Sequence, residues 1–235
     1  MINEYELFGK SKKEFEELFI TEDPWMLSYN VEQLRYKLTL VEINKNSEPK
    51  KDNILELGCA EGNFTELLSS SGYNVTAVDI SENAIIRAKK KNIKNANFIV
   101  DDMLSYVKNE NLNDFNIILL VESLCYLKND KRMELLKNIS EKINFDTCVY
   151  FSLPVKKNDV MFPSKKEIIN LFRINNFKLY SKSKVVSLIG INGRVSAKIK
   201  YLWFVKCFIY LHKILFPYRL NQQLFSFKKV IPKEL

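Results

Sequence analysis

The sequence predicts an α/β fold in which a mostly parallel β-sheet is covered by helices on both faces. Short apolar segments alternate along the chain with helical segments of roughly 10–14 residues, the pattern of right-handed βαβ units. Segment 116–121 (Asn-Ile-Ile-Leu-Leu-Val) is apolar at successive positions, as expected of a central parallel strand buried on both faces. Hydrophobic residues make up 46% and charged residues 27% of the chain, so it can bury an ordinary core.

The N-terminal part is expected to be helical. Apolar residues recur near a period of 3.6 in 11–20 and in 30–43, which predicts two helices. A turn-like break, 22–25 (Glu-Asp-Pro-Trp), separates them. The polar segment 44–52 contains Pro49 and is typical of a linker into the next element.

After this linker, strands and helices alternate. Strands are expected at 53–57, 74–79, 97–100, 116–121, 147–153, 177–186 and 224–231. Helices are expected at 62–70, 82–91, 130–143 and 164–174. Ser81 and Ser164 stand at the start of two of these helices, where serine is a favoured cap.

Composition excludes several classes of protein. The 235 residues suffice for one domain with an elaboration, and the chain has one His, His212, and four scattered Cys, 59, 125, 148 and 207. This argues against a metal centre, a disulfide scaffold and a Ser-His-Asp hydrolase, and fits a reducing, cytoplasmic compartment. The charged N-terminus predicts no signal peptide, and the apolar run 201–216 is too short and too charged to predict a membrane span.

The net charge of +8 is unevenly distributed. Residues 156–235 hold 17 Lys and Arg against 3 Asp and Glu, and segment 198–219 interleaves basic with aromatic side chains. This segment could form a helical cap over an acceptor pocket or a dimer face. It could instead lie on the anionic inner face of a membrane, or bind RNA by stacking and phosphate contacts.

The turn after the first expected strand is the main candidate for ligand binding. Strand 53–57 runs into Gly58, and Gly62 opens the next helix. Glycines let a ligand approach the backbone, and a helix N-terminus offers unpaired N–H groups. The spacing G-x-x-x-G, with Ala60 between the glycines, is neither a dinucleotide fingerprint nor a phosphate-binding P-loop.

Two acidic positions follow at the ends of the next strands. Asp79 ends the second strand, about 20 residues after the first glycine, where a carboxylate can bind ribose hydroxyls. Asp101, Asp102 and Met103 end the third strand. There a carboxylate can accept from an exocyclic amine, while an apolar side chain packs on an adenine face.

Taken in this order, the glycine turn, Asp79 and the segment 101–103 resemble class I S-adenosylmethionine-dependent methyltransferases. The resemblance covers roughly residues 50–155. The resemblance implies a Rossmann-like sheet of strand order 3-2-1-4-5-7-6 and S-adenosylmethionine as cofactor, with S-adenosylhomocysteine as product. It implies cofactor contacts from Gly58, Cys59, Ala60, Glu61, Gly62, Asp79, Ile80, Asp102, Met103 and Val121.

The flanking residues resemble the nodulation protein S (NodS) family more narrowly. The matching motifs are Asp23-Pro24-Trp25, the pair Glu32 and Arg35, and 122–127, E-x-L-x-Y-L. Members of this family N-methylate the amino group of a deacetylated chito-oligosaccharide. The resemblance implies an N-terminal helical lid, 1–46, that brings Trp25 and Arg35 over the cofactor, with Arg35 on its carboxylate.

The rest of the chain, 47–235, would be the methyltransferase domain. Segment 187–223, between the sixth and seventh strands, would be an insertion that caps the acceptor or faces a membrane. This insertion has no counterpart in the resemblance. Residues 144–146 (Asn-Phe-Asp) likewise replace the Pro-Gly-Gly turn of many relatives.

Methyl transfer needs an acceptor held in line with the methyl group, and a hydroxyl acceptor benefits from a base. Glu122 and Tyr126, just past the fourth strand, are the expected catalytic residues. The predicted function is methylation of a nitrogen or oxygen of a small molecule, such as a sugar or glycan. Alternatives are an RNA methyltransferase using the basic segment, although 121–124 (VESL) lacks the Pro-Pro box of base-amino enzymes, and a non-catalytic cofactor-binding subunit.

Overall fold

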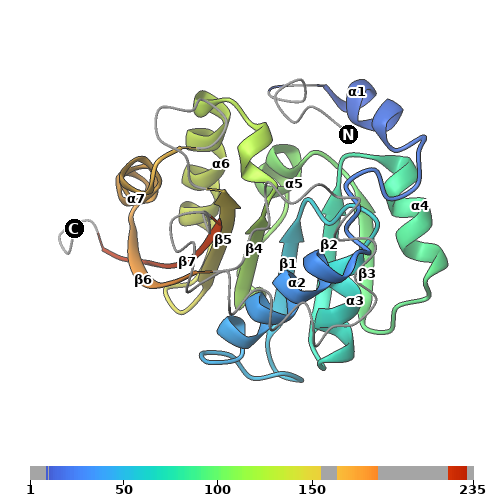
Figure 1. Ribbon diagram of the computed structural model, residues 1–235. Helices are drawn as coiled ribbons and strands as arrows, with labels where there is room; N and C mark the ends of the chain where they lie inside the picture. The colour runs from blue at the N-terminus through green and yellow to red at the C-terminus, as the bar shows by residue number, and fades with distance from the viewer. Residues whose placement is uncertain (1–8, 10, 155–162, 185–221, 232–235) are drawn as a thin grey trace, which may run out of the picture.

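One sheet organises the computed structural model, which describes residue 9 and residues 11–154, 163–184 and 222–231 (Figure 1). Within these residues the strand order is β3-β2-β1-β4-β5-β7-β6, and β7 alone runs antiparallel to the other strands. The predicted order is therefore confirmed. The strands are β1 (Asn53–Leu57), β2 (Asn74–Asp79), β3 (Ala96–Val100), β4 (Ile117–Val121), β5 (Cys148–Pro154), β6 (Phe177–Lys184) and β7 (Gln222–Lys229).

Helices cover both faces of this sheet (Figure 1). On one face lie α2 (Asn30–Ile43), α3 (Asn63–Ser70) and α4 (Glu82–Lys90). On the other lie α5 (Met103–Asn109), α6 (Asn129–Lys142) and α7 (Lys165–Ile174). The first helix, α1 (Lys12–Leu18), packs against α4, and the short 3-10 helix η2 (Leu124–Tyr126) follows β4.

The central strand β4 has the two-faced burial that its sequence predicts. Ile117 and Leu119 face the cluster under α2 and α3, whereas Ile118 and Leu120 face the cluster under α6. All four side chains are buried. Fully burying a side chain of this size stabilises the fold by about 1.5–3 kcal/mol, so the middle of the sheet is a rigid support for the loops at its edge.

Most expected elements agree with the structure to within two residues. Ser81 and Ser164 cap α4 and α7 through their hydroxyls, as predicted. The structure adds α5, a seven-residue helix that the sequence did not predict, and its N-cap is Asp102. A helix this short carries little periodic signal, which is why it was missed.

Several predicted features lie mostly or wholly outside the residues that the structure describes. Of the insertion 187–223, only 222–223 are described, as the start of β7, and the basic segment 198–219 and His212 lie outside the described residues. Among the helices that are described, none has the length and apolar character needed to cross a bilayer.

The turn from β1 to α3 has an unusual backbone. Gly58, Ala60 and Gly62 have φ angles of +86°, +49° and +72°, all in the left-handed region. A Cβ on Gly62 would lie 3.0 Å from the Phe98 ring, and one on Gly58 would lie 2.5 Å from Cβ of Ser123. Glycine is therefore required at both positions, because the turn packs tightly on its neighbours.

Candidate active site

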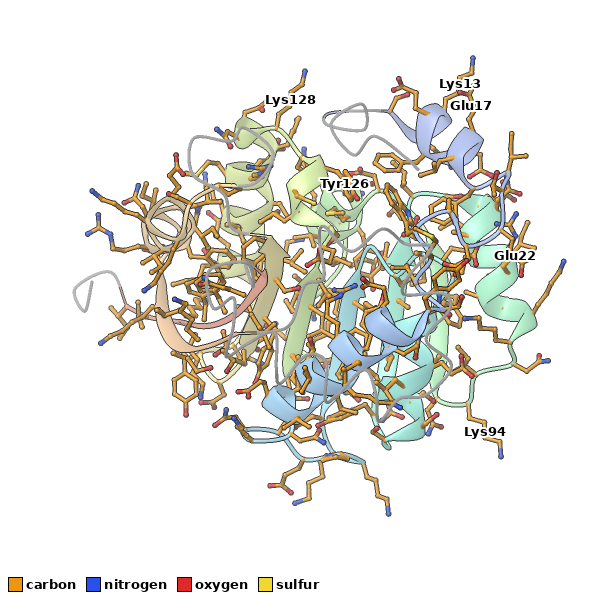
Figure 2. The ribbon with its side chains drawn as sticks, viewed as in Figure 1. Lys13, Glu17, Glu22, Lys94, Tyr126 and Lys128 are labelled. Atoms are coloured by element: carbon orange, nitrogen blue, oxygen red, sulfur yellow. The ribbon has the colours of Figure 1, made fainter. Side chains whose placement is uncertain are left out.

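A cavity of about 220 Å³ lies at the carboxyl ends of β1, β2, β3 and β4. This is the edge at which ligands bind in open α/β sheets. Residues 11–28, called the N-terminal segment below, cover the cavity with Phe15, Phe19, Trp25 and Leu27. Figure 2 shows Tyr126 at this end of the molecule and Lys94 at the opposite end. Most of the expected site residues line the cavity: Trp25, Arg35, Gly58, Cys59, Ala60, Asp79, Ile80, Asp102, Met103, Val121, Glu122 and Tyr126.

Asp79, the last residue of β2, is hydrogen-bonded to the turn that follows β1. Its Oδ2 accepts from the Ala60 N–H at 2.8 Å, and its Oδ1 accepts from the Ser81 N–H at 3.0 Å. Burial raises the pKa of Asp79, and these hydrogen bonds oppose that rise. A carboxylate offers about four acceptor sites, so both oxygens can also accept from ligand hydroxyls.

Asp102 has a structural role that its assignment as a ligand did not include. Its Oδ1 accepts from the N–H groups of Leu104 and Ser105, at 2.9 and 3.1 Å, and so caps α5. The cap fixes the carboxylate at the cavity wall. Met103 begins the helix and also lines the cavity, which keeps an apolar side chain beside the carboxylate.

Arg35 is a buried cation between two carboxylates. Its Nε and Nη2 each lie 2.6 Å from Oε2 of Glu32, and its Nη1 lies 3.6 Å from Oε1 of Glu122. Burial by itself lowers the pKa of Arg35, but the two carboxylates outweigh this effect and the pKa is raised. Within the described residues, Nη1 is buried without a hydrogen-bond acceptor. The cavity wall therefore offers a charged donor that suits a carboxylate.

Glu122 begins the segment that follows β4. Its φ of +60° is in the left-handed region, and its side chain is 29% exposed at the cavity. Its N–H donates to the Ser152 carbonyl at 3.0 Å, and its Oε1 accepts from the Ser152 hydroxyl at 3.0 Å. The carboxylate is thus both accessible and held in place.

Three aromatic side chains that line the cavity pack together through Tyr126. The Tyr126 ring lies 5.6 Å from the Phe15 ring and 5.5 Å from the Trp25 ring, measured between centroids. The Gly9 N–H donates to the Tyr126 carbonyl at 2.8 Å. Tyr126 is therefore a contact point between the β4 side of the cavity and the N-terminal segment.

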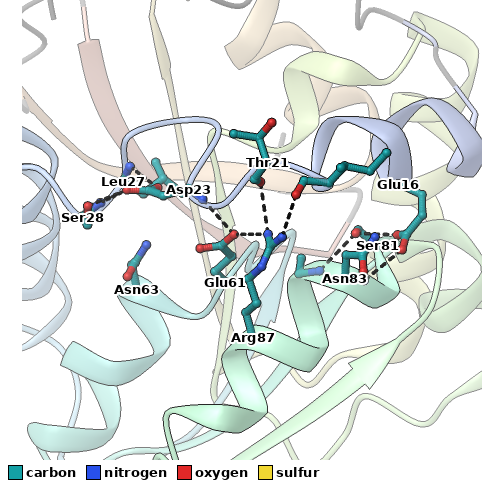
Figure 3. Close-up of polar contacts among 12 residues, drawn as sticks. Glu16, Thr21, Asp23, Leu27, Ser28, Glu61, Asn63, Ser81, Asn83 and Arg87 are labelled. Carbon is teal, nitrogen blue, oxygen red and sulfur yellow. Dashed lines mark hydrogen bonds and ion pairs between the residues drawn. The ribbon is translucent and has the colours of Figure 1, made fainter.

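Glu61 differs from its expected role. It does not line the cavity but faces the N-terminal segment, where its Oε1 accepts from Arg87 at 2.7 Å and from the Asp23 N–H at 2.9 Å (Figure 3). Arg87 also donates to the carbonyls of Ile20 and Thr21, both at 3.1 Å. Gly62 likewise lies outside the lining, because it packs on Phe98.

Glu16 anchors the same segment to α4. Its carboxylate accepts from the Ser81 hydroxyl at 2.6 Å and from the Asn83 N–H at 3.0 Å, next to the N-terminus of the helix (Figure 3). A negative charge is favourable there because the helix dipole is positive at this end. The N-terminal segment is thus fixed over the cavity by polar contacts as well as by the aromatic rings.

Sequence reasoning missed Glu56, which lines the cavity from β1. It is 4% exposed, and its Oε2 accepts from the Thr65 hydroxyl at 2.6 Å. Burial raises the pKa of Glu56 to about 8, although the Thr65 hydrogen bond opposes the rise. The signal was available, since Glu56 is a charged residue between the apolar residues Leu55 and Leu57 of β1.

We expect Glu56 to make the stability of the fold depend on pH. Its pKa is about 8 in the folded chain against an ordinary 4.5, so the folded state keeps a proton that the unfolded state has lost between these values. The free energy of unfolding should therefore fall with rising pH, by up to about 1.4 kcal/mol per unit. Urea unfolding at several pH values checks this: Glu56→Gln should gain stability relative to the wild type as pH rises. If the free energy of unfolding changed with pH by the same amount in Glu56→Gln and in the wild type, the prediction would be wrong.

Cys59 is a buried thiol in the cavity wall. Burial raises its pKa well above the ordinary value, so the thiol stays protonated. Across the part of the chain that the structure describes, no group of three or more His, Cys, Asp and Glu side chains is placed to hold a metal ion.

Known proteins resemble this chain in sequence and in fold. Nodulation protein S of Sinorhizobium fredii is 31% identical over 109 residues, covering 46% of this chain and 49% of that protein. Malonyl-[acyl-carrier protein] O-methyltransferase of Bacillus cereus is 28% identical over 123 residues, 51% of this chain and 44% of that protein. The matches thus span about half the length of these relatives.

Solved structures share the fold at low identity. The N-methyltransferase NodS from Bradyrhizobium japonicum, in complex with S-adenosylhomocysteine, superposes with a TM-score of 0.66 at 17% identity, covering 94% of this chain and 98% of that one. The [4+2]-cyclase SpnF superposes with a TM-score of 0.68 at 12% identity, covering 95% and 98%. The fold is therefore the Rossmann-like methyltransferase fold, which also supports other chemistry.

The family model for nodulation protein S (NodS) matches residues 10–161. This range contains α1 and α2, the strands β1 to β5 and the whole described lining of the cavity. The chain therefore belongs to the NodS family.

Proposed function

We propose that this chain is an S-adenosylmethionine-dependent methyltransferase that acts on an amino group of a sugar or glycan. The cofactor and the reaction are supported by membership of the NodS family and by the NodS structure with S-adenosylhomocysteine. The single observation that carries the cofactor part of the proposal is the buried Nη1 of Arg35, beside a cavity that also presents Asp79 and Asp102. Acceptors for hydroxyls and amines and a donor for a carboxylate are the groups that an amino-acid nucleoside requires. The amino acceptor is supported by the likeness to the N-methyltransferase NodS.

The residues of the cavity fit this cofactor. Asp79 would hold the ribose hydroxyls, Asp102 and Met103 the adenine, and Arg35 the carboxylate, while Gly58 lines the cavity. When bound, S-adenosylmethionine supplies an electrophilic methyl group on a sulfonium and leaves as neutral S-adenosylhomocysteine.

Glu122 would act on the acceptor. At neutral pH an amine acceptor is an ammonium ion, so its nitrogen would first lose one proton. Its lone pair would then form the bond to the methyl carbon while the bond from that carbon to the sulfonium sulfur breaks. The Glu122 carboxylate, exposed at the cavity and held by Ser152 and Arg35, is placed to accept that proton. Tyr126 would orient the acceptor from the aromatic side of the cavity.

Replacing Glu122 with glutamine tests this role. The amide keeps the size of the side chain but cannot accept the proton at neutral pH, so kcat should fall by about 100-fold or more. The dissociation constant of S-adenosylmethionine should change by less than about threefold, since the substitution leaves the cofactor contacts in place. Methyl transfer from labelled cofactor to glucosamine oligomers and calorimetry measure the two quantities.

A matched control is available on α2. Glu42 is paired with Lys45 at 2.7 Å and lies outside the cavity, so Glu42→Gln should leave kcat unchanged. Equal kcat in Glu122→Gln and the wild type would remove Glu122 from the mechanism. If the wild type binds the cofactor but methylates no amine or hydroxyl in a broad panel, the proposed activity is wrong.

A further inference from the structure

Ser152 is a buried polar residue near the carboxyl end of β5. It lies on β5, opposite Val121 of β4, and is 1% exposed. A hydroxyl at such a position destabilises the fold unless it makes a hydrogen bond. The bond that Ser152 makes is to Oε1 of Glu122, at 3.0 Å.

The backbone of Ser152 contacts the same residue. Its carbonyl accepts from the Glu122 N–H at 3.0 Å, one residue beyond the end of β4. Glu122 is held there with a φ of +60°, a strained conformation for a residue other than glycine. Such a conformation persists only where surrounding contacts fix it, and Ser152 supplies two of them.

The Glu122 carboxylate is held from two sides. Oε1 accepts from Ser152 on β5 and lies 3.6 Å from Nη1 of Arg35 on α2. The Ser152 contact has hydrogen-bond geometry, whereas the Arg35 contact is longer than a hydrogen bond. Of these two contacts, the one with the serine hydroxyl therefore constrains the direction of the carboxylate more tightly.

From these contacts we propose that Ser152 is a positioning residue, whose hydroxyl holds the Glu122 carboxylate in the orientation needed to receive the proton of the acceptor. The inference rests on the proposed function, which assigns that proton to Glu122. Ser152 acts through Glu122, because it does not line the cavity itself.

Ser152→Ala should lower kcat by about tenfold, since one hydrogen bond to a charged group is lost. The KM for the acceptor and the cofactor affinity should change by less than about threefold. Ser152→Thr keeps the hydroxyl and should retain kcat. Ser152→Cys replaces the hydroxyl with a thiol, which is a poor hydrogen-bond donor, and should lower kcat as much as Ser152→Ala does. This variant fills the site and therefore tests the proposal even if the alanine variant folds badly.

Ser226 provides the matched control. It is 1% exposed on β7, and its hydroxyl lies 2.7 Å from that of Ser181, so Ser226→Ala also removes a buried hydroxyl from the same sheet. Its kcat should equal that of the wild type. A fall in kcat as large as that of Ser152→Ala would show that any buried serine has this effect and would overturn the proposal.

Crystal structures of the wild type, Ser152→Ala and Ser226→Ala give a readout that does not depend on activity. The Glu122 carboxylate should turn away from its wild-type position in Ser152→Ala alone. An unmoved carboxylate would overturn the positioning role. If the wild type transfers no methyl group, the proposed function fails, but this comparison still decides whether Ser152 fixes Glu122.

Discussion

Asp79→Ala is expected to weaken the binding of S-adenosylmethionine by at least about 100-fold. The carboxylate would hold two ribose hydroxyls, and each hydrogen bond to a charged group is worth about 1.5–3 kcal/mol, which is at least about tenfold in affinity. It also accepts from the N–H groups of Ala60 and Ser81, so its removal loosens the turn that approaches the ligand. Isothermal titration calorimetry measures the loss, with circular dichroism to check that the variant is folded.

Asp52→Ala is the control for this substitution. The Asp52 carboxylate also accepts from a backbone N–H, that of Glu48 at 2.7 Å, but it lies outside the cavity. Its removal should leave the affinity unchanged. A folded Asp79→Ala protein that binds the cofactor as well as Asp52→Ala does would place the ribose elsewhere.

Gly58→Ala is expected to lower both the stability of the fold and the affinity for the cofactor. The new Cβ would lie 2.5 Å from Cβ of Ser123, and the φ of +86° is strained for alanine. We expect a loss of about 1–3 kcal/mol from the free energy of unfolding. The affinity should fall by about tenfold or more, because Ser123 and the turn must move apart at the cavity wall.

Two further variants separate the effect of backbone strain from the effect of the close contact with Ser123. Gly72→Ala places alanine at a φ of +100° with its nearest contact at 3.4 Å, outside the cavity, so it should lose stability without losing affinity. Ser123→Gly removes the atom that collides and should restore binding when combined with Gly58→Ala. If the double variant binds no better than Gly58→Ala, the close approach does not explain the defect.

The sequence predicted the sheet because its signals are local. Strands β1, β2 and β4 are short apolar runs, and the glycine turn follows the first of them directly. Position at a strand end was enough to place Asp79 at the cavity, since the carboxyl ends of parallel strands meet at one edge.

The direction of individual side chains could not be predicted in this way. Glu61 faces the N-terminal segment because the backbone turns through positive φ at Ala60 and Gly62. Arg35 meets Glu122 only when α2 packs beside β4, a contact between residues far apart in the chain. Such pairings depend on tertiary packing, which residue type and spacing do not encode on their own.

The turn after β1 serves two neighbouring regions through consecutive residues. Ala60 donates to Asp79 at the end of β2, whereas Glu61 accepts from Asp23 of the N-terminal segment and from Arg87 of α4. A shift of this backbone would disturb both the N-terminal segment and the cavity wall. During divergence of the family, we therefore expect changes in this turn to be accepted when compensating changes arise on both sides, which makes it an unfavourable place to begin engineering a new specificity.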